Sequence, residues 1–153
     1  MIKERLNKLK EKLNLLDLDG YVIPKNDDFF SEYSLKDRLK IISNFSGSAG
    51  YAVILKNKNF LFVDGRYSLQ AEIESGNLFK VKKFQEIFNC TLFKNLKLGI
   101  DPKMFTSNQI HNFFSKNNNV KLINENLIDQ IFPKKSSVSK PFYSIDEKIV
   151  GES

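Results

Sequence analysis

Ser48 and His111 are the residues whose types could supply a nucleophile and its base. Ser48 lies in S-G-S-A-G (Ser46–Gly50), which approaches the G-x-S-x-G turn of hydrolase nucleophiles. That turn requires glycine where this chain has Ser46. A triad would also require His111 to leave a predicted helix whose start is explained by the capping pattern T-x-x-Q at Thr106. The glycines therefore predict a bend entering a strand, not a hydrolytic serine.

Other catalytic and ligand-binding classes have weaker signals. The single Cys90 excludes an internal disulfide and, without a nearby His or Cys, indicates an inert, partly buried thiol. No lysine follows the glycines of G-S-A-G (Gly47–Gly50) at the Walker spacing, so a phosphate-binding loop is not predicted. Metal-dependent hydrolysis needs several converging Asp, Glu and His ligands, and the chain has 1 His and no H-E-x-x-H motif. We predict neither a catalytic residue nor a metal ligand here.

Two polar clusters carry the side chains of greatest interest. D-D-F-F-S-E-Y spans Asp27–Tyr33, and D-G-R-Y spans Asp64–Tyr67, where a strand gives way to a helix. Asp64 is placed to cap that helix, and Arg66 to pair with Glu32 or Asp64. Two interpretations stay open: a hydrogen-bonded network that locks two loops against a hairpin, or a rim that faces another domain or subunit. The residues concerned are Ser31, Glu32, Tyr33, Arg38, Asp64, Arg66 and Tyr67.

The elements that position these clusters are predicted from hydrophobic periodicity. Apolar residues step by four and three from Ile2 to Leu16, which is one stripe of an amphipathic helix. A short strand is expected at 20–23, stopped by Pro24. A hairpin is expected at 51–55 and 60–63. Further helices are predicted at 35–42, 66–73, 87–94, 107–116 and 127–131, and further strands at 79–84, 97–100 and 120–123.

Composition and element order together predict a single α/β domain with a mixed central sheet flanked by helices. The 153 residues, 41% hydrophobic, suffice for one core. A net charge of +6 raises nucleic acid as a partner, but lysines are spread along the chain without aromatic–basic interleaving, so we expect none. No apolar run approaches the ~20 residues of a membrane span. The lone cysteine and the missing leader favour a cytoplasmic setting.

The motifs also resemble a known domain in their order. D-D-F-F-S-E-Y is followed by F-S-G-S-A-G, V-D-G-R-Y-S-L-Q-A, L-G-I-D-P-K-M-F-T and N-L-I-D-Q-I-F. This series resembles the N-terminal domain of Xaa-Pro aminopeptidases, in the creatinase/prolidase (pita-bread) group. The resemblance implies a mixed sheet of about six strands, a domain at 1–132, and a linker at 133–153 leading toward a second domain. Many relatives carry His at the position of Phe29, so this segment departs from the pattern.

The resemblance implies a non-catalytic N-terminal domain of a metal-dependent Xaa-Pro aminopeptidase, which removes the residue preceding proline. The parent enzyme would use two divalent, manganese-like metal ions in a catalytic domain that we expect to be absent here. Its partners would be the downstream domains, further copies in a homo-oligomer, and a peptide with proline at the second position. The polar clusters would then serve domain packing, oligomerisation and substrate access. Two alternatives stay open: a free-standing binding or oligomerisation module of the same fold, and a prolidase- or creatinase-type parent.

Overall fold

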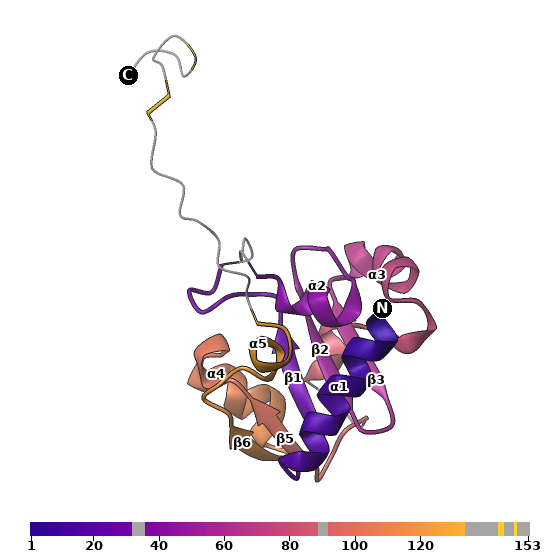
Figure 1. Cartoon of the computed structure of the whole chain (residues 1–153), viewed down its shortest axis with the longest axis vertical. Coiled ribbons are helices and arrows are strands. Elements are labelled where there is room, and N and C mark those ends of the chain that lie inside the picture. The colour runs from indigo at the N-terminus through magenta and orange to yellow at the C-terminus, as the bar shows by residue number, and fades with distance from the viewer. Residues whose placement is uncertain (32–35, 89–91, 134–143, 146–148, 150–153) are drawn as a thin grey trace.

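A computed structural model describes residues 1–31, 36–88, 92–133, 144–145 and 149. Its centre is a 6-stranded sheet in the order β4-β3-β2-β1-β5-β6 (Figure 1). The strands are β1 (Gly20–Pro24), β2 (Gly50–Leu55), β3 (Asn59–Val63), β4 (Lys80–Lys83), β5 (Lys97–Ile100) and β6 (Asn119–Leu122). The predicted α/β class, with one mixed sheet that includes a hairpin, is confirmed.

Strand direction decides where the loops lie. β2 is antiparallel to both of its neighbours, β1 and β3, whereas β1, β5 and β6 pair in parallel, as do β3 and β4. The carboxyl ends of all strands except β2 therefore meet the start of β2 at one edge, here called the carboxyl edge. In open α/β sheets this is the edge where ligands bind. Its segments are 25–31, 46–49, 64–67, 84, 101–103 and 123–126.

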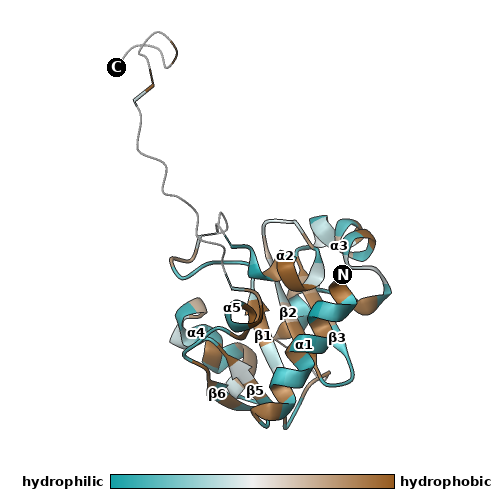
Figure 2. Cartoon of the chain, in the orientation of Figure 1, coloured by the Kyte–Doolittle hydropathy of each residue, from teal (hydrophilic) through white to brown (hydrophobic). Residues whose placement is uncertain are grey.

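The two faces of the sheet are covered differently. One face packs against α1 (Ile2–Leu15), α2 (Arg38–Ser43), α3 (Ser68–Ser75) and α5 (Leu127–Ile131), and hydrophilic and hydrophobic residues alternate along α1 as in an amphipathic helix (Figure 2). The other face packs against shorter turns and a phenylalanine-rich core. The short elements are η1 (Gly65–Tyr67), η2 (Gly76–Leu78), η3 (Phe84–Ile87), η4 (Pro102–Met104), α4 (Ser107–Gln109) and η5 (Ile110–Ser115, a π-helix).

β1 extends one residue beyond its predicted end. Pro24 is its last residue and lies opposite Tyr51 in the ladder. The missing N–H of Pro24 is not needed there, because the N–H of Lys25 donates to the carbonyl of Gly50 at 3.0 Å. β5 pairs with β1 only as far as Val22. A strand that is central for most of its length therefore accepts proline at its end.

The predicted helix at 87–94 is wrong in the residues that the structure describes. A 3₁₀ turn, η3, already begins at Phe84, and residues 92–93 form a bend. The turn starts early because Glu86 Oε1 accepts a hydrogen bond of 2.9 Å from the N–H of Lys83. Asn95 then takes a left-handed φ of 56° before β5. A local side-chain acceptor overrides the apolar periodicity of this segment.

The predicted helix at 107–116 is confirmed at its start, and its later part is a π-helix. Thr106 and Gln109 form the expected capping box, with hydrogen bonds of 2.9 and 3.2 Å. After one short α-turn the chain winds as a π-helix from Ile110 to Ser115. Such stretches are rare and carry i→i+5 hydrogen bonds. The start of α2 also differs from prediction, because Asp37 caps the helix and Arg38 is its first residue.

Candidate functional site

The carboxyl edge collects the polar clusters found in the sequence. Segments far apart in the chain meet there because the strands that precede them run in parallel. The edge has two parts. The Arg38 cluster comprises Asp28, Lys36, Arg38, Asp101, Asn126 and Asp129, and the Asp64 corner comprises Ser48, Asp64, Arg66 and Tyr67.

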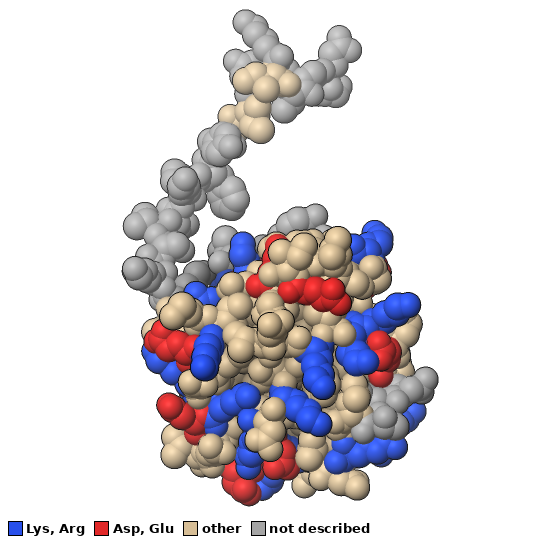
Figure 3. Space-filling model, turned by 90° about the vertical axis from the view of Figure 1, so that its right-hand side faces the viewer, with Lys and Arg blue, Asp and Glu red and all other residues tan. Residues whose placement is uncertain are grey.

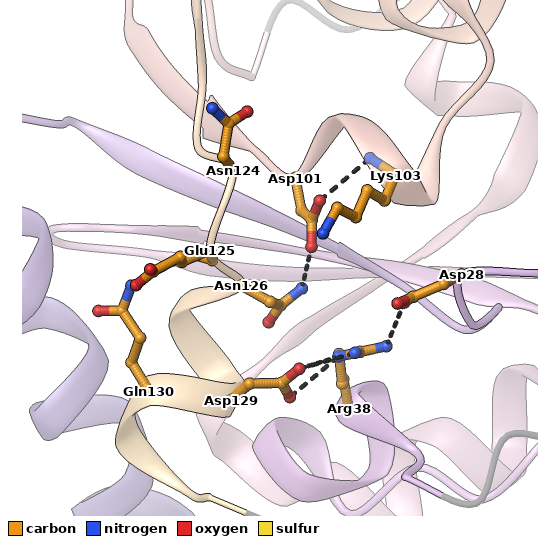
Figure 4. Close-up of a pocket in the computed structure, with 9 residues that line it drawn as sticks. All are labelled: Asp28, Arg38, Asp101, Lys103, Asn124, Glu125, Asn126, Asp129 and Gln130. Atoms are coloured by element: carbon orange, nitrogen blue, oxygen red, sulfur yellow. Dashed lines mark hydrogen bonds and ion pairs between the residues drawn. The ribbon is translucent and has the colours of Figure 1, made fainter.

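Arg38 is the centre of the first part, with a side chain that is only 10% exposed. Its Nε lies 3.0 and 3.2 Å from the two carboxylate oxygens of Asp129, and its Nη2 lies 2.7 Å from Asp129 Oδ2. Its Nη1 lies 3.3 Å from Asp28 Oδ1 (Figure 4). The paired contacts are charge-assisted and fix the plane of the guanidinium. One side chain thereby joins α2, α5 and the loop after β1.

Asp37 sets the position of Arg38. Its Oδ1 accepts a hydrogen bond of 2.9 Å from the N–H of Lys40 and so caps α2. Its Oδ2 pairs with the ammonium group of Lys25, which is itself buried at the end of β1. Asn44, in a left-handed conformation with φ of 64°, ends the helix. This short helix is held at both ends, so Arg38 projects from a fixed support.

Asp129 receives a second cation from Lys36, whose Nζ lies 2.8 Å from Asp129 Oδ1. The same ammonium group donates to the carbonyl of Phe132, just after α5. Burial would raise the pKa of Asp129, but hydrogen bonds from Arg38 and Lys36 outweigh it and lower that pKa. Burial would likewise lower the pKa of Arg38, and the bonds to Asp129 raise it instead. Both groups are therefore charged at neutral pH.

A hollow of about 360 Å³ lies beside this cluster (Figure 4). Asp101, 3% exposed, forms part of its wall and accepts hydrogen bonds of 3.0 Å from Asn126 Nδ2 and from the N–H of Lys103. Asn126 also caps α5 by accepting from the N–H of Ile128 at 3.0 Å. Asp101 and Asn126 are therefore engaged in holding the end of β5 against α5. They support the hollow but are not free to bind a ligand.

The Asp64 corner also contains an arginine–aspartate pair, but here the pair is exposed to solvent. Asp64 Oδ1 accepts hydrogen bonds from the N–H and the Nε of Arg66 at 3.0 and 2.9 Å. The Arg66 side chain is 78% exposed, and its guanidinium carbon lies 5.7 Å from the centre of the Tyr67 ring. The Tyr67 hydroxyl is 2.9 Å from Ser48 Oγ. The bonds from Arg66 lower the pKa of Asp64.

The expected contact between Arg66 and a carboxylate is present, and its partner is Asp64. The expected capping by Asp64 is present as well, on η1, which leads into α3. Glu32 and Tyr33 lie outside the described residues, as does Cys90. The Ser48 hydroxyl bonds to Tyr67, and His111 is exposed on η5. The role of these residues, as a structural network or as an interface, stays a prediction.

The loop after β1 is closed by its own side chain. Asp27 Oδ1 accepts hydrogen bonds of 2.9 Å from the N–H groups of both Phe29 and Ser31. Between them Phe30 takes a φ of 61°, a conformation that a bulky residue rarely adopts. Phe29 is 89% exposed. This segment thus presents two aromatic side chains at the carboxyl edge.

Sequence reasoning missed the partners of Arg38. Asp28 and Asp129 both lie in motifs that carried the resemblance, D-D-F-F-S-E-Y and N-L-I-D-Q-I-F. Both are carboxylates beside apolar residues, and a partly buried carboxylate needs a cation. Their residue type therefore indicated that each would have a basic partner. Nothing in the spacing indicated which cation, since Arg38 and Asp129 lie 91 positions apart.

Three further properties concern surface charge, metal ions and membrane-spanning helices. On the face shown in Figure 3, basic and acidic side chains are interspersed. Within the described ranges no group of three or more His, Cys, Asp or Glu could hold a metal ion, so no step through a metal is assigned to these residues. The helices in the same ranges include none that is long and apolar enough to cross a membrane.

Comparison with known proteins gives consistent matches. The family described as Creatinase/Prolidase N-terminal domain matches residues 5–131. A probable Xaa-Pro aminopeptidase P of Coprinopsis cinerea is 32% identical over 98% of this chain and 27% of its own length. An X-prolyl aminopeptidase of Caenorhabditis elegans, described as a cytosolic enzyme with a di-nuclear active site, superposes with a TM-score of 0.75 at 25% identity, over 91% of this chain and 27% of that one.

A separately solved N-terminal domain of a putative metallopeptidase from Corynebacterium diphtheriae shares the fold, with a TM-score of 0.60 at 17% identity. It covers 80% of this chain and 94% of that domain. The present chain therefore spans about a quarter of the length of the long enzymes (27%) and nearly all of an isolated domain. With the family match over residues 5–131, this chain belongs to the creatinase/prolidase N-terminal domain family.

Proposed function

We propose that this chain serves as the N-terminal, non-catalytic domain of a metal-dependent Xaa-Pro aminopeptidase. The observation that carries the proposal is the convergence of the family-type motifs on the carboxyl edge, where they form one fixed and one exposed polar part. The parent enzyme would remove the residue preceding proline, with two manganese-like metal ions held by its catalytic domain. The domain proper would end near residue 132, with 133–153 as the linker to the next domain.

The two parts of the edge suit two tasks. The Arg38 cluster holds α5 and the carbonyl of Phe132, so it would fix the end of the domain from which the linker continues. The Asp64 corner presents Arg66 to solvent on a stiffened turn. A guanidinium in that state is suited to a contact with the catalytic domain or with a neighbouring copy, where it would shape access for the peptide. A cytoplasmic location is proposed as well, since the C. elegans relative is described as cytosolic.

The test is a fusion of this chain to the portion of the Coprinopsis relative that follows its matching region. We expect the fusion with manganese to release the first residue of an Xaa-Pro peptide faster than the portion alone. The present chain alone is expected to release none, because its described residues offer no metal site.

Equal rates for the fusion and for the portion alone would contradict the proposal and favour a free-standing module of the same fold. Light scattering of the same proteins would show whether the domain promotes oligomers.

A further inference from the structure

The carboxyl edge has a second hollow, of about 260 Å³, on the phenylalanine-rich side of the sheet. Its walls include three aromatic side chains, Phe30, Tyr51 and Phe84, together with the backbone around Ser48–Gly50. The rings of Tyr51 and Phe84 lie 5.4 Å apart between centres and are tilted by 34°. Neither Tyr51 nor Phe84 is fully buried. The hollow is slightly smaller than the ~300 Å³ at which ligand pockets begin, so it suits one or two residues.

The aromatic wall is supported from behind. Phe113 lies 6.2 Å from Tyr51 and 6.3 Å from Phe84, in edge-to-face geometry with both. Phe105, 4% exposed, stacks on Tyr51 at 6.1 Å. These contacts fix the ring planes, because offset and edge-to-face pairs are the favoured arrangements. The wall is therefore formed before any ligand arrives.

Phe30 completes the wall only through an unfavourable backbone conformation. Its φ of 61° is held by the hydrogen bonds that Asp27 makes to the residues on either side. A left-handed conformation at a bulky residue is found mainly where the surrounding structure imposes it, often at binding sites. Here it places a half-exposed ring against the hollow.

The polar groups around the hollow are mostly occupied. The Lys25 ammonium is paired with Asp37, and the backbone N–H of Lys25 donates to the carbonyl of Gly50. The Ser48 hydroxyl bonds to that of Tyr67. The Tyr51 hydroxyl, by contrast, has no hydrogen-bond partner in the described part of the chain. Lys25 is the one charged residue among the described residues of the wall, and its charge is balanced by Asp37. The hollow therefore favours a ligand with an uncharged ring. It leaves one hydroxyl to bind a carbonyl group.

We infer that this hollow binds a prolyl residue of an extended peptide. Aromatic-lined grooves accept proline because its ring is preformed and loses little entropy on binding. The match is electrostatic as well, since the ring C–H groups beside the amide nitrogen are partly positive and the aromatic faces partly negative. The Tyr51 hydroxyl then donates to a peptide carbonyl. The inference deepens the proposed function, on which it rests, by assigning a secondary subsite for the peptide outside the catalytic domain.

The test is a titration of the ¹⁵N-labelled chain with acetyl-Ala-Pro-Pro-Pro-Ala-amide, followed by amide chemical shifts. We expect saturable shifts at Phe30, Tyr51 and Phe84, and none with the all-alanine peptide of equal length. Tyr51→Phe should weaken binding about 2- to 10-fold, the effect of one hydrogen bond. Phe84→Ala should weaken it by about tenfold or more. The exposed Leu122→Ser on β6 serves as the matched control and should bind like the parent chain.

Equal shifts with both peptides, or binding that Tyr51→Phe and Phe84→Ala leave unchanged, would overturn the inference. Shifts that follow protein concentration alone would overturn it too, since a second copy would then fill the hollow. Tyr51→Phe keeps the ring and its packing, so the test does not depend on a variant that fails to fold. An active fusion whose domain binds no prolyl peptide would refute the subsite and leave the proposed function standing.

Discussion

The Arg38 cluster and the Asp64 corner contain the same ion pair in opposite surroundings. In both, an arginine bonds to an aspartate at the carboxyl edge, with shortest N–O distances of 2.7 and 2.9 Å. The arginine side chain is 10% exposed in the cluster and 78% exposed in the corner. The N–O distance alone therefore does not indicate how much each pair contributes to the stability of the fold.

From the difference in burial we expect the two pairs to have different roles. A desolvated guanidinium must keep its acceptors, and removing one leaves an uncompensated charge. An exposed pair exchanges its partner for water at little cost. The Arg38 cluster is thus expected to stabilise the fold, whereas the Asp64 corner is available for contacts with other molecules. We expect this contrast to assign the network interpretation to the Arg38 cluster and the interface interpretation to the Asp64 corner.

The largest expected effect is from Asp129→Ala. Among the described residues, the substitution leaves buried Arg38 with Asp28, at 3.3 Å, as its carboxylate partner. Because Asp129 is 36% exposed, we expect a loss of about 2–4 kcal/mol in the free energy of unfolding, less than for a fully buried pair. Urea unfolding at neutral pH measures it.

Two further variants serve as controls for that loss. Asp64→Ala, in the exposed corner, should lower the urea midpoint much less than Asp129→Ala does, because it removes only an exposed ion pair and the cap of a short turn. The double variant Arg38→Met with Asp129→Leu should recover part of the loss, because it removes both charges. A loss from Asp64→Ala equal to that from Asp129→Ala would remove the distinction between the two regions.

The second prediction concerns pH. The pKa of Asp129 in the folded chain is below its ordinary value of 3.8, so the folded state binds this proton less readily than the unfolded chain does. Its stabilising contribution is therefore complete above about pH 5 and is lost as pH falls below about 4, through the folded pKa. The difference in unfolding free energy between the parent chain and Asp129→Asn should shrink over that range. A difference that stays constant down to about pH 2.5 would contradict this assignment.

The third prediction uses Phe30, which lies in the same loop as Asp28. At a φ of 61°, glycine is free of the steric cost that any side chain with a Cβ meets. Phe30→Gly should therefore be about 1 kcal/mol more stable than Phe30→Ala, although both lose the same ring. Thermal unfolding of the matched pair measures the difference. Equal stability would show that the loop relaxes to an ordinary conformation and that the ring is not held in place by strain.

The fold was predictable from the sequence because local patterns and tertiary structure agree over most of the chain. Apolar stripes and short β-branched runs gave the hairpin, β5 and α5 nearly at their observed bounds, and Thr106 with Gln109 gave the capping box. Prediction failed in the described part of 87–94, which follows the 3₁₀ turn Phe84–Ile87, where Glu86 accepts a hydrogen bond from the N–H of Lys83. Periodicity cannot detect a competition of that kind.

The site was less predictable for a physical reason. The Asp64–Arg66 pair is local and follows from turn geometry, so the sequence indicated it. The pairing of Arg38 with Asp129 depends on α2 and α5 packing side by side, which only the assembled sheet determines. The second hollow likewise requires the ends of β1 and β4 and the start of β2 to meet at one edge. Residues that are brought together only by tertiary structure have no characteristic spacing in a single sequence, so such pairs could not be predicted.

The smallest effect on the isolated chain is expected from Arg66→Ala, and this makes it the most direct test of the comparison. Arg66 contacts its neighbours Asp64 and Tyr67 and is largely in solvent, so its removal should leave the melting temperature of the chain unchanged within error. In the fusion with the Coprinopsis portion, the same substitution should reduce Xaa-Pro cleavage or oligomer formation, because a fixed guanidinium would be lost from an interface. Arg66→Lys should restore little, since an ammonium group cannot reproduce the planar fork. If Arg66→Ala lowers the melting temperature of the isolated chain as Asp129→Ala does, the corner is part of the structural network and the contrast between the two regions is wrong.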